Sequence, residues 1–559
     1  MVELFLYMYC EQTQKKWNKM HKVHRNKLKQ ASKTKYDLII IGGGITGAGI
    51  ALDAASRGIS TLLVEKKDFA SGTSSKSTKL IHGGLRYLKQ LEFKLVADVG
   101  KERAVVHHIA PNLVHPMKMI LPFTKTGKLG KVSTFMALTA YDWLANVEGA
   151  DKKQMLSVEE AKEVEPLLKD LNIKGAGYYA EYRTDDARLT IEVIKKAQEK
   201  GATCINYCEV TEFIQSGKKV EGVEVIDHLS NQKFSFKANQ IVNATGPWVD
   251  TLRKKVETIK GKRLQLTKGV HIVIPFDEFP VKQPVYFDTS DERMIFAIPR
   301  LGVTYIGTTD TVYTKNMDEV YATKEDVDYI TDQVHTYFGK TFIKKSNIQS
   351  TWAGLRPLIY EDGKDPSELS RKDEIFHSKN GLLSIAGGKL TGYRTMSQRI
   401  VDIVAKRLDN SKECRTEKIK LGKEPFKNYK EVKKYIKSIS KKLPSSLDQK
   451  LEAEYLVSNY GKDAAYILKK SSSFNISDAV NLLLSELNYV IKNEMVMTSA
   501  DFWIRRTGRI YFRIDTVNAF LEIVNERLNS IFDWTNEQKE VDLKEIKSEL
   551  QKTIEFKNS

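Results

Sequence analysis

The sequence has little cysteine, and its few cysteines match neither a metal site nor a disulfide scaffold. Four cysteines in 559 residues are too few to staple a secreted domain. Cys204 and Cys208 form a C-x3-C pair, but no second Cys or His pair lies near them, so we expect no zinc and no other metal site. We interpret the cysteines as small apolar side chains in a reducing compartment.

Long apolar runs are also lacking. No run reaches the ~18–20 apolar residues that a bilayer-spanning helix needs. Residues 2–10 are apolar but lack the positive start and the small-residue cleavage site of a signal peptide. The composition, 41% apolar and 29% charged, excludes a disordered chain, a collagen-like fibre and a multi-span membrane protein. Any membrane contact is therefore expected to be peripheral or monotopic.

Acidic residues are the third shortage, since 71 acids face 89 bases and leave a net charge of +18. An excess of this size suggests phosphate, nucleic acid or an anionic membrane surface as a partner. Residues 1–35 hold nine bases and two acids, and residues 411–470 hold sixteen bases and eight acids. For residues 12–35 three interpretations stay open: a disordered basic tail, a surface helix with a membrane or transit role, and an upstream start with Met20 as the true first residue.

The length predicts two to four domains. Residues 36 to about 400 alternate strand-like and helix-like segments, and a Lys-rich, Pro-punctuated stretch follows to about residue 450. The remainder shows apolar residues at helical spacing, for example at residues 451–459, 476–489 and 516–532. We predict three parts, which are a flexible basic extension at 1–35, a mixed α/β region at 36–410 and a helical domain at 411–559.

A dinucleotide-binding pattern opens the α/β region. Residues 37–41 (DLIII) have the apolar, β-branched composition of a buried parallel strand. They run directly into residues 42–47 (GGGITG), a G-x-G-x-x-G match, and residues 48–57 then predict a helix. Residues 60–64 predict a second strand that ends at Glu65. Because strand, glycines, helix, second strand and acid occur in order, we predict dinucleotide binding.

Each part of the pattern has a physical role. Gly42 permits the tight turn, Gly44 lets the backbone approach a pyrophosphate, and Gly47 allows close packing of helix on strand. The pyrophosphate lies at the helix N-terminus, where free N–H groups and the dipole favour negative charge. Glu65 follows Gly47 by 18 positions and is placed to bind ribose hydroxyls, which disfavours the 2′-phosphate of NADP.

The next segment favours FAD over NAD. Residues 70–87 (ASGTSSKSTKLIHGGLRY) form a long Ser/Thr/Gly loop, where a plain nicotinamide enzyme would continue with a helix and a third strand. Such a loop offers many hydroxyl and N–H groups to an extended cofactor. Residues 238–243 predict another apolar strand, and Ala244, Thr245 and Gly246 follow it in a small-residue turn that brings backbone close to the cofactor again.

Together these segments resemble the FAD-dependent glycerol-3-phosphate dehydrogenases, a family within the amino-acid-oxidase-like flavoproteins. The resemblance extends from residue 37 into the helical tail, and the basic extension before Tyr36 departs from it. It implies an α/β fold in which a Rossmann-like FAD-binding domain is interleaved with an antiparallel-sheet substrate domain, followed by the all-α C-terminal domain. The matching motifs are DLIIIGGGITGAGIALDAASRG, SGTSSKSTKLIHGGLRYL, DDARL, VNATGPWV, KGVHIVIP, IGTTD, GLRPL and GGKLTGYR.

The resemblance implies a set of FAD-binding residues. The ADP half is held by Gly42, Gly44, Thr46, Gly47 and Glu65. The flavin half is lined by Thr73, Ser74, Ser75, Ser77, Lys79, Leu80 and His82, with Gly83 and Gly84 near the ring. The second strand contributes Ala244, Thr245, Gly246 and Trp248. A late helix start contributes Gly388, Lys389, Leu390 and Thr391.

The resemblance also implies glycerol 3-phosphate as the substrate. Its phosphate dianion suits forked cationic donors, because Arg binds phosphate through two hydrogen bonds. Oxidation also needs a neutral base near the 2-hydroxyl, with His271 as first candidate and His82 as second. Lys389 has two open roles, at the phosphate or beside the reduced flavin. The implied substrate-binding residues are Arg86, Tyr87, His271, Arg356, Arg371 and Lys389; the implied catalytic residues are His271, Arg356 and His82.

Residues 185–189 (DDARL) contain Asp185, Asp186 and Arg188, which we interpret as a structural ion-pair turn; a place at the border of the active site stays open.

The electron acceptor is also open. The sequence has no haem or iron–sulfur cysteine pattern, so the resemblance implies a membrane quinone, with molecular oxygen as second candidate. An amine or 2-hydroxy-acid oxidase of the same fold is the alternative enzyme.

The basic charge can now be divided. Residues 1–35 and 411–470 lie outside the catalytic motifs, and they fit an anionic membrane surface that supplies quinone, or simple solvation. No basic motif interleaved with aromatic residues supports nucleic acid as a partner. We therefore expect a cytoplasmic protein that associates peripherally with the inner face of the cell membrane. The sequence leaves the oligomeric state open and is compatible with a homodimer.

Overall fold

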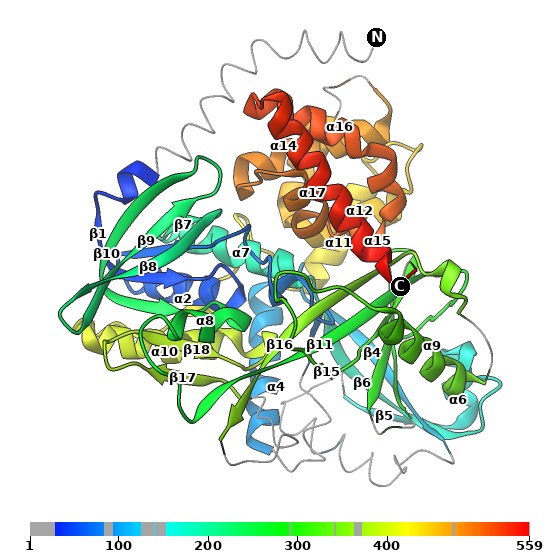
Figure 1. Cartoon of the computed structure of the whole chain (residues 1–559). Helices are drawn as coiled ribbons and strands as arrows, with labels where there is room; N and C mark the ends of the chain where they lie inside the picture. Colours follow the sequence, from blue (N-terminus) through cyan, green and yellow to red (C-terminus); the bar gives the residue numbers. More distant parts are fainter. Residues whose placement is uncertain are drawn as a thin grey trace.

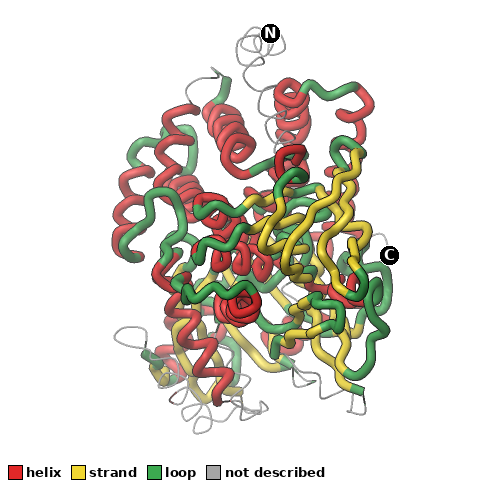
Figure 2. Tube along the Cα trace, turned by 90° about the vertical axis from the view of Figure 1, so that its left-hand side faces the viewer, coloured by secondary structure: helices red, strands yellow, loops and turns green. Residues whose placement is uncertain are grey.

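The computed structural model describes residues 28–82, 93–124, 139, 152–289, 291, 293–339, 343–362, 372–471, 474 and 476–557. Two sheets with their helices form the lower part of the molecule, and a helical domain lies above them (Figure 1). The side view in Figure 2 shows the same division between the helix-rich and the strand-rich parts. The architecture confirms the predicted fold class.

The first sheet is built around β1 (Lys35–Ile41), whose residues 38–41 are fully or almost fully buried. This strand pairs in parallel with β10 and β2 at its two edges. Its two faces lie in separate cores, Leu38 and Ile40 in one and Ile39 and Ile41 in the other, which explains its continuously apolar composition. The strand order is β17-β18-β10-β1-β2-β7, and the hairpin of β8 and β9 joins through β10. The bounds are β2 (Thr61–Val64), β7 (Thr203–Ile205), β8 (Cys208–Ser216), β9 (Lys219–Asp227), β10 (Gln232–Asn243), β17 (Glu374–His377) and β18 (Leu383–Ala386).

Helices cover one face of this sheet. The helix α2 begins at Ile45, three residues before the predicted start at Ala48, because the residues after the capping Gly44 are already helical. The hydrophobic core between α2 and the sheet also includes side chains of α4, α7 and α10. The bounds are α2 (Ile45–Ser56), α4 (Phe93–Ile109), α7 (Asp186–Glu199), α8 (Val249–Arg253) and α10 (Tyr393–Arg407).

The end of the predicted flexible extension is packed. A helical turn covers residues 28–31, and the side chains of Leu28 and Ala31 join the core on the other face of the sheet, together with Tyr36. Residues 28–35 are therefore part of the fold rather than of a flexible tail. Residues 1–27 lie outside the described part of the chain.

The second sheet is antiparallel except where β12 meets β4, and it confirms the predicted antiparallel substrate domain. The strand order is β15-β11-β14-β13-β12-β4-β6-β3, with β16 paired to β11 and β5 paired to β6. The long strand β11 (Lys262–Pro275) pairs with β14, β15 and β16, and α6 (Val158–Val164) and α9 (Lys324–Phe338) pack on the same face of the sheet. The other strands are β3 (Leu80–Ile81), β4 (His115–Thr124), β5 (Gln154–Leu156), β6 (Ile173–Arg183), β12 (Val285–Asp288), β13 (Met294–Arg300), β14 (Val303–Gly307), β15 (Thr311–Val312) and β16 (Ser350–Glu361).

The C-terminal part is helical, as predicted, from α11 onward. The three segments with helical spacing are confirmed as α12, α14 and α16. The Lys-rich, Pro-punctuated stretch at residues 409–450 contains the amphipathic helix α11 with lysines on its outer face. The bounds are α11 (Tyr429–Ser440), α12 (Gln449–Tyr460), α13 (Ala464–Ser471), α14 (Asp478–Glu494), the π-helix η10 (Asp501–Arg506), α15 (Arg509–Phe512), α16 (Ile514–Phe532) and α17 (Asn536–Ile554).

Residues 411–428, assigned from sequence to the helical domain, hold only the short 3-10 turn η8 (Thr416–Lys418) and divide between two cores: Phe426 joins the core of the helical domain, and Leu421 packs on the first sheet's helices. The Leu421 N–H donates to the Ile109 carbonyl at 2.8 Å, and the Leu421 side chain joins the core beneath α2. Across the described ranges, no helix combines the length and the apolar composition that a bilayer crossing would require.

Candidate functional site

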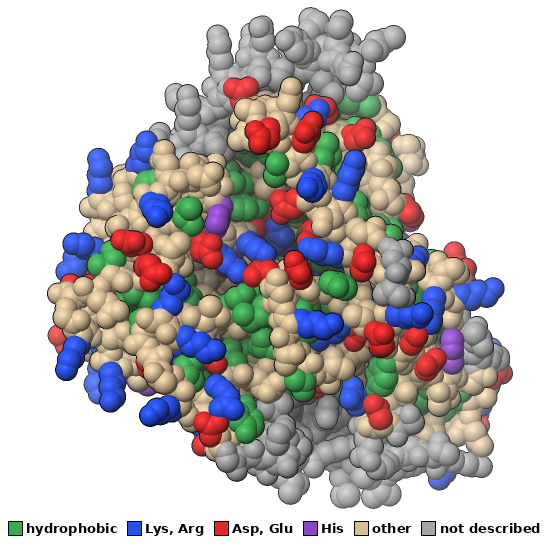
Figure 3. Space-filling model, in the orientation of Figure 1, with side chains coloured by type: hydrophobic (Ala, Val, Ile, Leu, Met, Phe, Trp, Pro, Cys, Tyr) green, Lys and Arg blue, Asp and Glu red, His purple; other side chains and the backbone are tan. Residues whose placement is uncertain are grey.

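A cavity of about 880 Å³ lies where the two sheets and the helical domain meet. In Figure 3 the surface is hollowed in this region, below the helical domain, and both basic and acidic side chains surround the hollow. The cavity is lined by the glycine turn, the Ser/Thr loop, the ends of β10 and β18, and the strands β11 and β16. The segments predicted to bind the cofactor are therefore brought together in space.

The glycine turn has the geometry that the motif predicts. Gly42 has a φ of +109°, and a Cβ built on it would lie 2.6 Å from the Ala244 carbonyl oxygen. A Cβ on Gly47 would lie 1.9 Å from the Gly42 carbonyl oxygen. A side chain at either position would push the turn away from β10 or from α2, so both glycines are required by packing.

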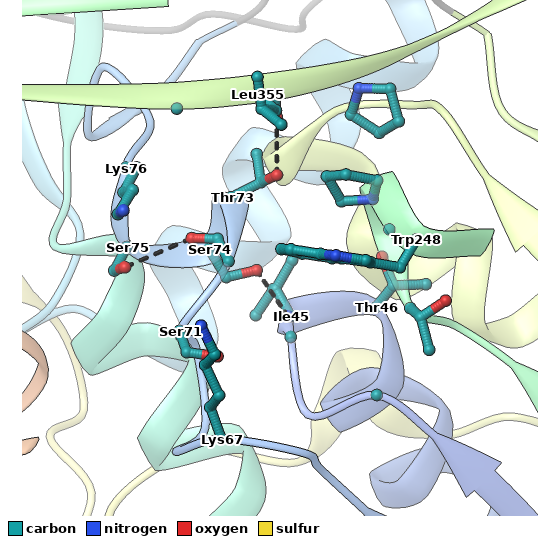
Figure 4. Close-up of a pocket in the computed structure, with 18 of the residues that line it drawn as sticks. Ile45, Thr46, Lys67, Ser71, Thr73, Ser74, Ser75, Lys76, Trp248 and Leu355 are labelled. Atoms are coloured by element: carbon teal, nitrogen blue, oxygen red, sulfur yellow. Dashed lines mark hydrogen bonds between the residues drawn. The ribbon is translucent and has the colours of Figure 1, made fainter. Parts of the chain in front are cut away.

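The N-terminus of α2 opens into the cavity beside this turn. Gly44 caps the helix without a side-chain hydrogen bond, and the Ile45 N–H donates to the Ser74 hydroxyl at 2.9 Å (Figure 4). A helix N-terminus lined by N–H and hydroxyl groups is a favourable site for a pyrophosphate.

Glu65 lies at the end of β2 and lines the same cavity. Its Oε2 accepts from the Gly43 N–H at 2.6 Å, and its Oε1 accepts from the Lys67 N–H at 2.9 Å. Burial raises the pKa of the Glu65 carboxyl, and the two amide donors lower it in part. The carboxyl group is thus fixed in the cavity wall beside the glycine turn.

The loop after Glu65 forms one wall. Among the residues expected at the flavin half, those that line the cavity are Thr73, Ser74, Ser75, Ser77, Leu80 and His82. The Thr73 hydroxyl donates to the Leu355 carbonyl at 2.7 Å and ties the loop to β16 (Figure 4). Lys79 was expected in this wall as well, but its side chain does not line the cavity. Its ammonium pairs with Asp186 at 2.6 Å and donates to the Ser75 carbonyl at 3.0 Å, which holds the loop from behind.

The opposite wall comes from the turn after β10 and from the segment before α10. Ala244, Thr245, Gly246 and Trp248 line it, and so do Gly388, Lys389, Leu390 and Thr391. The Trp248 indole extends towards the Ser/Thr loop (Figure 4), where a Cβ on Gly72 would lie 3.1 Å from it, and the Lys66 ammonium sits 4.4 Å from the centre of a Trp248 ring. Lys389 precedes the 3-10 turn η7 (Leu390–Gly392) as its capping residue.

His271 lies at the far end of the cavity, on β11, and is 1% exposed. Its ring stacks on Trp352 at 4.6 Å, and its Nε2 lies 3.1 Å from the Thr78 hydroxyl. Burial holds the pKa of His271 well below its usual value, and the nearby charges of Arg356 and Lys79 lower it further. The imidazole is therefore neutral near pH 7.

Arg356 reaches the same end of the cavity from β16, which pairs with β11. Its guanidinium donates to the Thr309 carbonyl at 3.1 Å, to Asp310 at 3.2 Å and to the Thr308 hydroxyl at 2.8 Å. A neutral histidine and a fixed guanidinium thus stand together in the wall of one cavity.

Two further glycines make this arrangement possible. A Cβ on Gly269 would lie 2.3 Å from the Arg356 guanidinium, and a Cβ on Gly307 would lie 2.3 Å from the His271 ring. Neither glycine was singled out in the sequence, and neither was Thr78. Only the register of β11, β14 and β16 reveals them, because their partners are distant in the chain.

The DDARL segment forms ion pairs, and besides the local pair of Arg188 with Glu192 they reach distant elements. Asp185 caps α7 by accepting from the Arg188 N–H at 3.0 Å, and it pairs with Arg300 at 2.8 Å. The Arg188 guanidinium pairs with Glu494 of α14 at 2.9 Å. The segment is therefore an anchor for other elements rather than a self-contained turn.

Some predicted residues cannot be placed. Gly83, Gly84, Arg86, Tyr87 and Arg371 lie outside the described residues.

The helical domain contributes lining residues that no sequence signal marked, namely Ala500, Ile504, Arg505, Glu545, Glu549 and Lys552. Burial raises the pKa of Glu545 to about 6, and the charge of Asp501 adds to this effect.

Comparisons with known proteins give the family. Residues 37–394 match the family described as FAD dependent oxidoreductase, and residues 414–539 match the C-terminal domain of alpha-glycerophosphate oxidase. The aerobic glycerol-3-phosphate dehydrogenase of Staphylococcus haemolyticus is 47% identical over 538 residues, covering 93% of this chain and 95% of that protein. This chain belongs to the FAD-dependent glycerol-3-phosphate dehydrogenase family.

Further relatives and solved structures support the same family. The aerobic glycerol-3-phosphate dehydrogenase of Bacillus subtilis is 47% identical over 522 residues, covering 92% of this chain and 94% of that protein. The crystal structure of the glycerol-3-phosphate dehydrogenase from Bacillus halodurans complexed with FAD matches with a TM-score of 0.80 and 42% identity, covering 94% of this chain and 96% of that chain. The L-alpha-glycerophosphate oxidase of Mycoplasma pneumoniae, at 19% identity and a TM-score of 0.54, shares the fold.

The cavity fits the family's cofactor, and FAD as the predicted cofactor is confirmed. The uncapped start of α2 suits the pyrophosphate, and Glu65 suits the ribose. The missing side chain at Gly42 leaves the space that the turn needs beside β10.

We predict that Gly42→Ala yields protein without FAD. The added Cβ meets the Ala244 carbonyl oxygen, and the φ of +109° is strained for any L side chain. The ratio of flavin to protein absorbance in purified protein measures the loss. Gly201→Ala is the matched control, because Gly201 has a φ of +102° but nothing within 4 Å of its added Cβ. A Gly42→Ala protein with full flavin content would contradict the assignment.

Proposed function

We propose that this chain oxidises glycerol 3-phosphate to dihydroxyacetone phosphate and passes the electrons to a membrane quinone. The proposal rests on one observation above all: a neutral, buried histidine and a fixed guanidinium line the same end of the FAD cavity. Bound FAD supplies a two-electron acceptor for the hydride that leaves C2. The residues of the chain supply the proton acceptor and the phosphate site.

His271 is the proposed proton acceptor for the 2-hydroxyl. A general base must be unprotonated at the working pH, and its burial beside two cationic side chains keeps the imidazole neutral. The stacked Trp352 and the Thr78 hydroxyl restrict the ring's orientation. His82 lines the cavity as well and stays the second candidate.

Arg356 is the proposed phosphate ligand. Its hydrogen bonds to Thr308, Thr309 and Asp310 fix the plane of the guanidinium before the substrate arrives. A guanidinium held in this way can offer parallel N–H donors to a phosphate. Lys389 lies in the same cavity and adds a second positive charge, at the phosphate or beside the flavin.

Anaerobic reduction of the flavin tests the proposed reaction. We expect glycerol 3-phosphate to bleach the yellow protein, and lactate and sarcosine to leave it yellow. His271→Gln should slow the bleaching roughly 10²- to 10⁴-fold at saturating substrate, the usual contribution of a general base. Because the pKa of His271 lies well below 6.5, the rate in unaltered protein should stay level as the pH falls from 8 towards 6.5.

His228→Gln is the control for this measurement, because His228 lines the cavity but is paired with Glu209. An unaltered rate in His271→Gln would exclude His271 as the base. Bleaching by lactate or sarcosine at a similar rate would remove glycerol 3-phosphate as the specific substrate.

Arg356→Ala should raise the KM for glycerol 3-phosphate about tenfold or more, because a charge-assisted hydrogen bond contributes about 1.5–3 kcal/mol. Flavin content should stay unchanged, since Arg356 lies at the substrate end of the cavity. Steady-state kinetics and flavin absorbance measure both. The control Arg263→Ala removes an exposed arginine of β11 that pairs with Asp362. A KM like that of the control would remove Arg356 from the phosphate site.

We further propose that the quinone is reached by peripheral binding to the inner face of the cell membrane, through α11. The exposed lysines of this helix recur at three- and four-residue intervals, while Val432 and Ile439 are buried on the opposite side. Basic side chains near an anionic membrane surface contribute about 1 kcal/mol each. The exposed lysines are Lys430, Lys433, Lys434 and Lys437.

The rate at which each oxidant reoxidises the reduced protein identifies the electron acceptor. We expect faster reoxidation by quinone in anionic vesicles than by dissolved oxygen. The double change Lys433→Glu and Lys437→Glu should weaken vesicle binding about tenfold or more, given about 1 kcal/mol per basic residue. Added salt should remove this difference.

The matched double change Lys218→Glu and Lys219→Glu, at the exposed β8–β9 turn, should leave vesicle binding unaltered. Equal losses in both double variants would exclude α11 as the membrane contact. Oxygen has support of its own as an acceptor, because the C-terminal match is to the domain of an alpha-glycerophosphate oxidase. Rapid reoxidation by oxygen would therefore make the protein an oxidase.

A further inference from the structure

The FAD cavity is closed on one side by the helical domain, and the contact between them is ionic. Asp68 lies three residues after Glu65 and is 0% exposed. Its carboxylate accepts from Arg505 Nε at 2.6 Å, and from Arg506 Nη1 and Nη2 at 2.6 and 3.0 Å. We call these three residues the arginine clasp. It joins the loop that carries Glu65 to a segment more than 400 positions away in the chain.

The clasp depends on an unusual helix. Arg505 and Arg506 end the π-helix η10, in which the Thr507 N–H donates to the Phe502 carbonyl, five residues back, at 3.1 Å. Neighbouring side chains of an α-helix point about 100° apart, yet here two neighbours converge on one carboxylate. π-helical turns are rare and are frequently found at functional sites.

The charges of the clasp are deeply buried. Arg506 is 0% exposed and also donates to the Glu494 carbonyl at 2.6 Å, and Arg505 pairs with Asp501. Burial alone would raise the pKa of the Asp68 carboxyl, but Arg506 and Arg505 hold it below its usual value. Buried ion pairs often stabilise a protein no more than apolar side chains would. Stability alone therefore does not account for three buried charges, whereas fixing a position does.

The clasp and its neighbours fix the ribose end of the cavity. The Tyr207 N–H donates to the Lys67 carbonyl, and the Tyr207 hydroxyl donates to Asp501 at 2.6 Å. Asn206 donates to both Asp68 and the Met495 carbonyl, at 3.1 Å each. The ends of β2 and β7 are thus tied to each other and to the helical domain.

We propose that the helical domain is part of the FAD site, and that Arg506 and Arg505 are positioning residues that hold Glu65 and the 65–71 loop against the cofactor. The same domain places Ile504 and Arg505 of η10 and Glu549 of α17 in the cavity wall. The inference rests on FAD binding and not on the substrate or the acceptor, so it stands or falls separately from the proposed reaction.

The test compares two arginines of the helical domain. Arg506→Gln breaks the clasp, and Arg509→Gln breaks an equally buried ion pair, with Glu486, that stays within the helical domain. The dissociation constant of FAD is measured by titrating apoprotein and following flavin fluorescence. Thermal unfolding and the KM for glycerol 3-phosphate at saturating FAD are measured on the same proteins.

We expect Arg506→Gln to raise the dissociation constant of FAD about tenfold or more, within the usual range of coupling between contacting residues. The KM at saturating FAD should stay within about twofold, because Arg356 and His271 are held by β16 and β11, and the hydrogen bonds of the clasp do not involve these strands. Arg509→Gln should lower the unfolding temperature and leave FAD affinity within about twofold.

An unaltered FAD affinity in Arg506→Gln overturns the proposal. So does a loss of affinity in Arg509→Gln as large as in Arg506→Gln, since that would follow from stability alone. Should Arg506→Gln fail to fold, Tyr207→Phe decides, because it removes only the hydroxyl group, with its bonds to Asp501 and Thr498. A weaker FAD affinity in Tyr207→Phe with an unchanged unfolding temperature supports the proposal, and an unchanged affinity rejects it.

Discussion

The site depends on one close approach, between the turn after β1 and the end of β10. The two strands pair in parallel up to Ile41 and Asn243, so the segments that follow them leave the sheet at the same edge. The Ala244 carbonyl then occupies the space of a side chain at residue 42, and only glycine fits. This turn directs the start of α2 into the cavity. Residues 200 positions apart in sequence thereby form one cradle for a long, flat cofactor.

Burial leaves some ionisable groups of the site neutral and others charged, according to the charges beside them. His271 is neutral because burial and two nearby cations disfavour its protonation. Asp68 and Asp185 stay charged because guanidinium groups face each of them. Arg356 therefore has two effects, since the charge that suits a phosphate also keeps the neighbouring imidazole unprotonated. A bound phosphate dianion would offset part of that charge, which favours proton uptake by His271 once the substrate is in place.

Local patterns explain what could be predicted from the sequence. The glycine motif, the acid after β2 and the Ser/Thr loop depend on neighbours in the chain, and the structure brings their residues together at one cavity. Long-range pairing explains what could not be predicted. Gly269 and Gly307 matter only because β11 places them beside Arg356 and His271. Lys79 does not line the cavity although Thr78 and Leu80 do, because its backbone takes a left-handed φ of +57° and its ammonium pairs with Asp186.

The helical domain was the least predictable part, since apolar spacing shows only that a helix packs. Its contact with the FAD cavity uses buried charges, and such contacts specify position more strictly than apolar surfaces do. An apolar interface tolerates small sliding, because many arrangements bury similar area. A guanidinium displaced from a buried carboxylate leaves both charges poorly paired, and complete loss of one partner of such a pair costs about 3–5 kcal/mol. The clasp at Asp68 therefore transmits the position of the helical domain directly to Glu65.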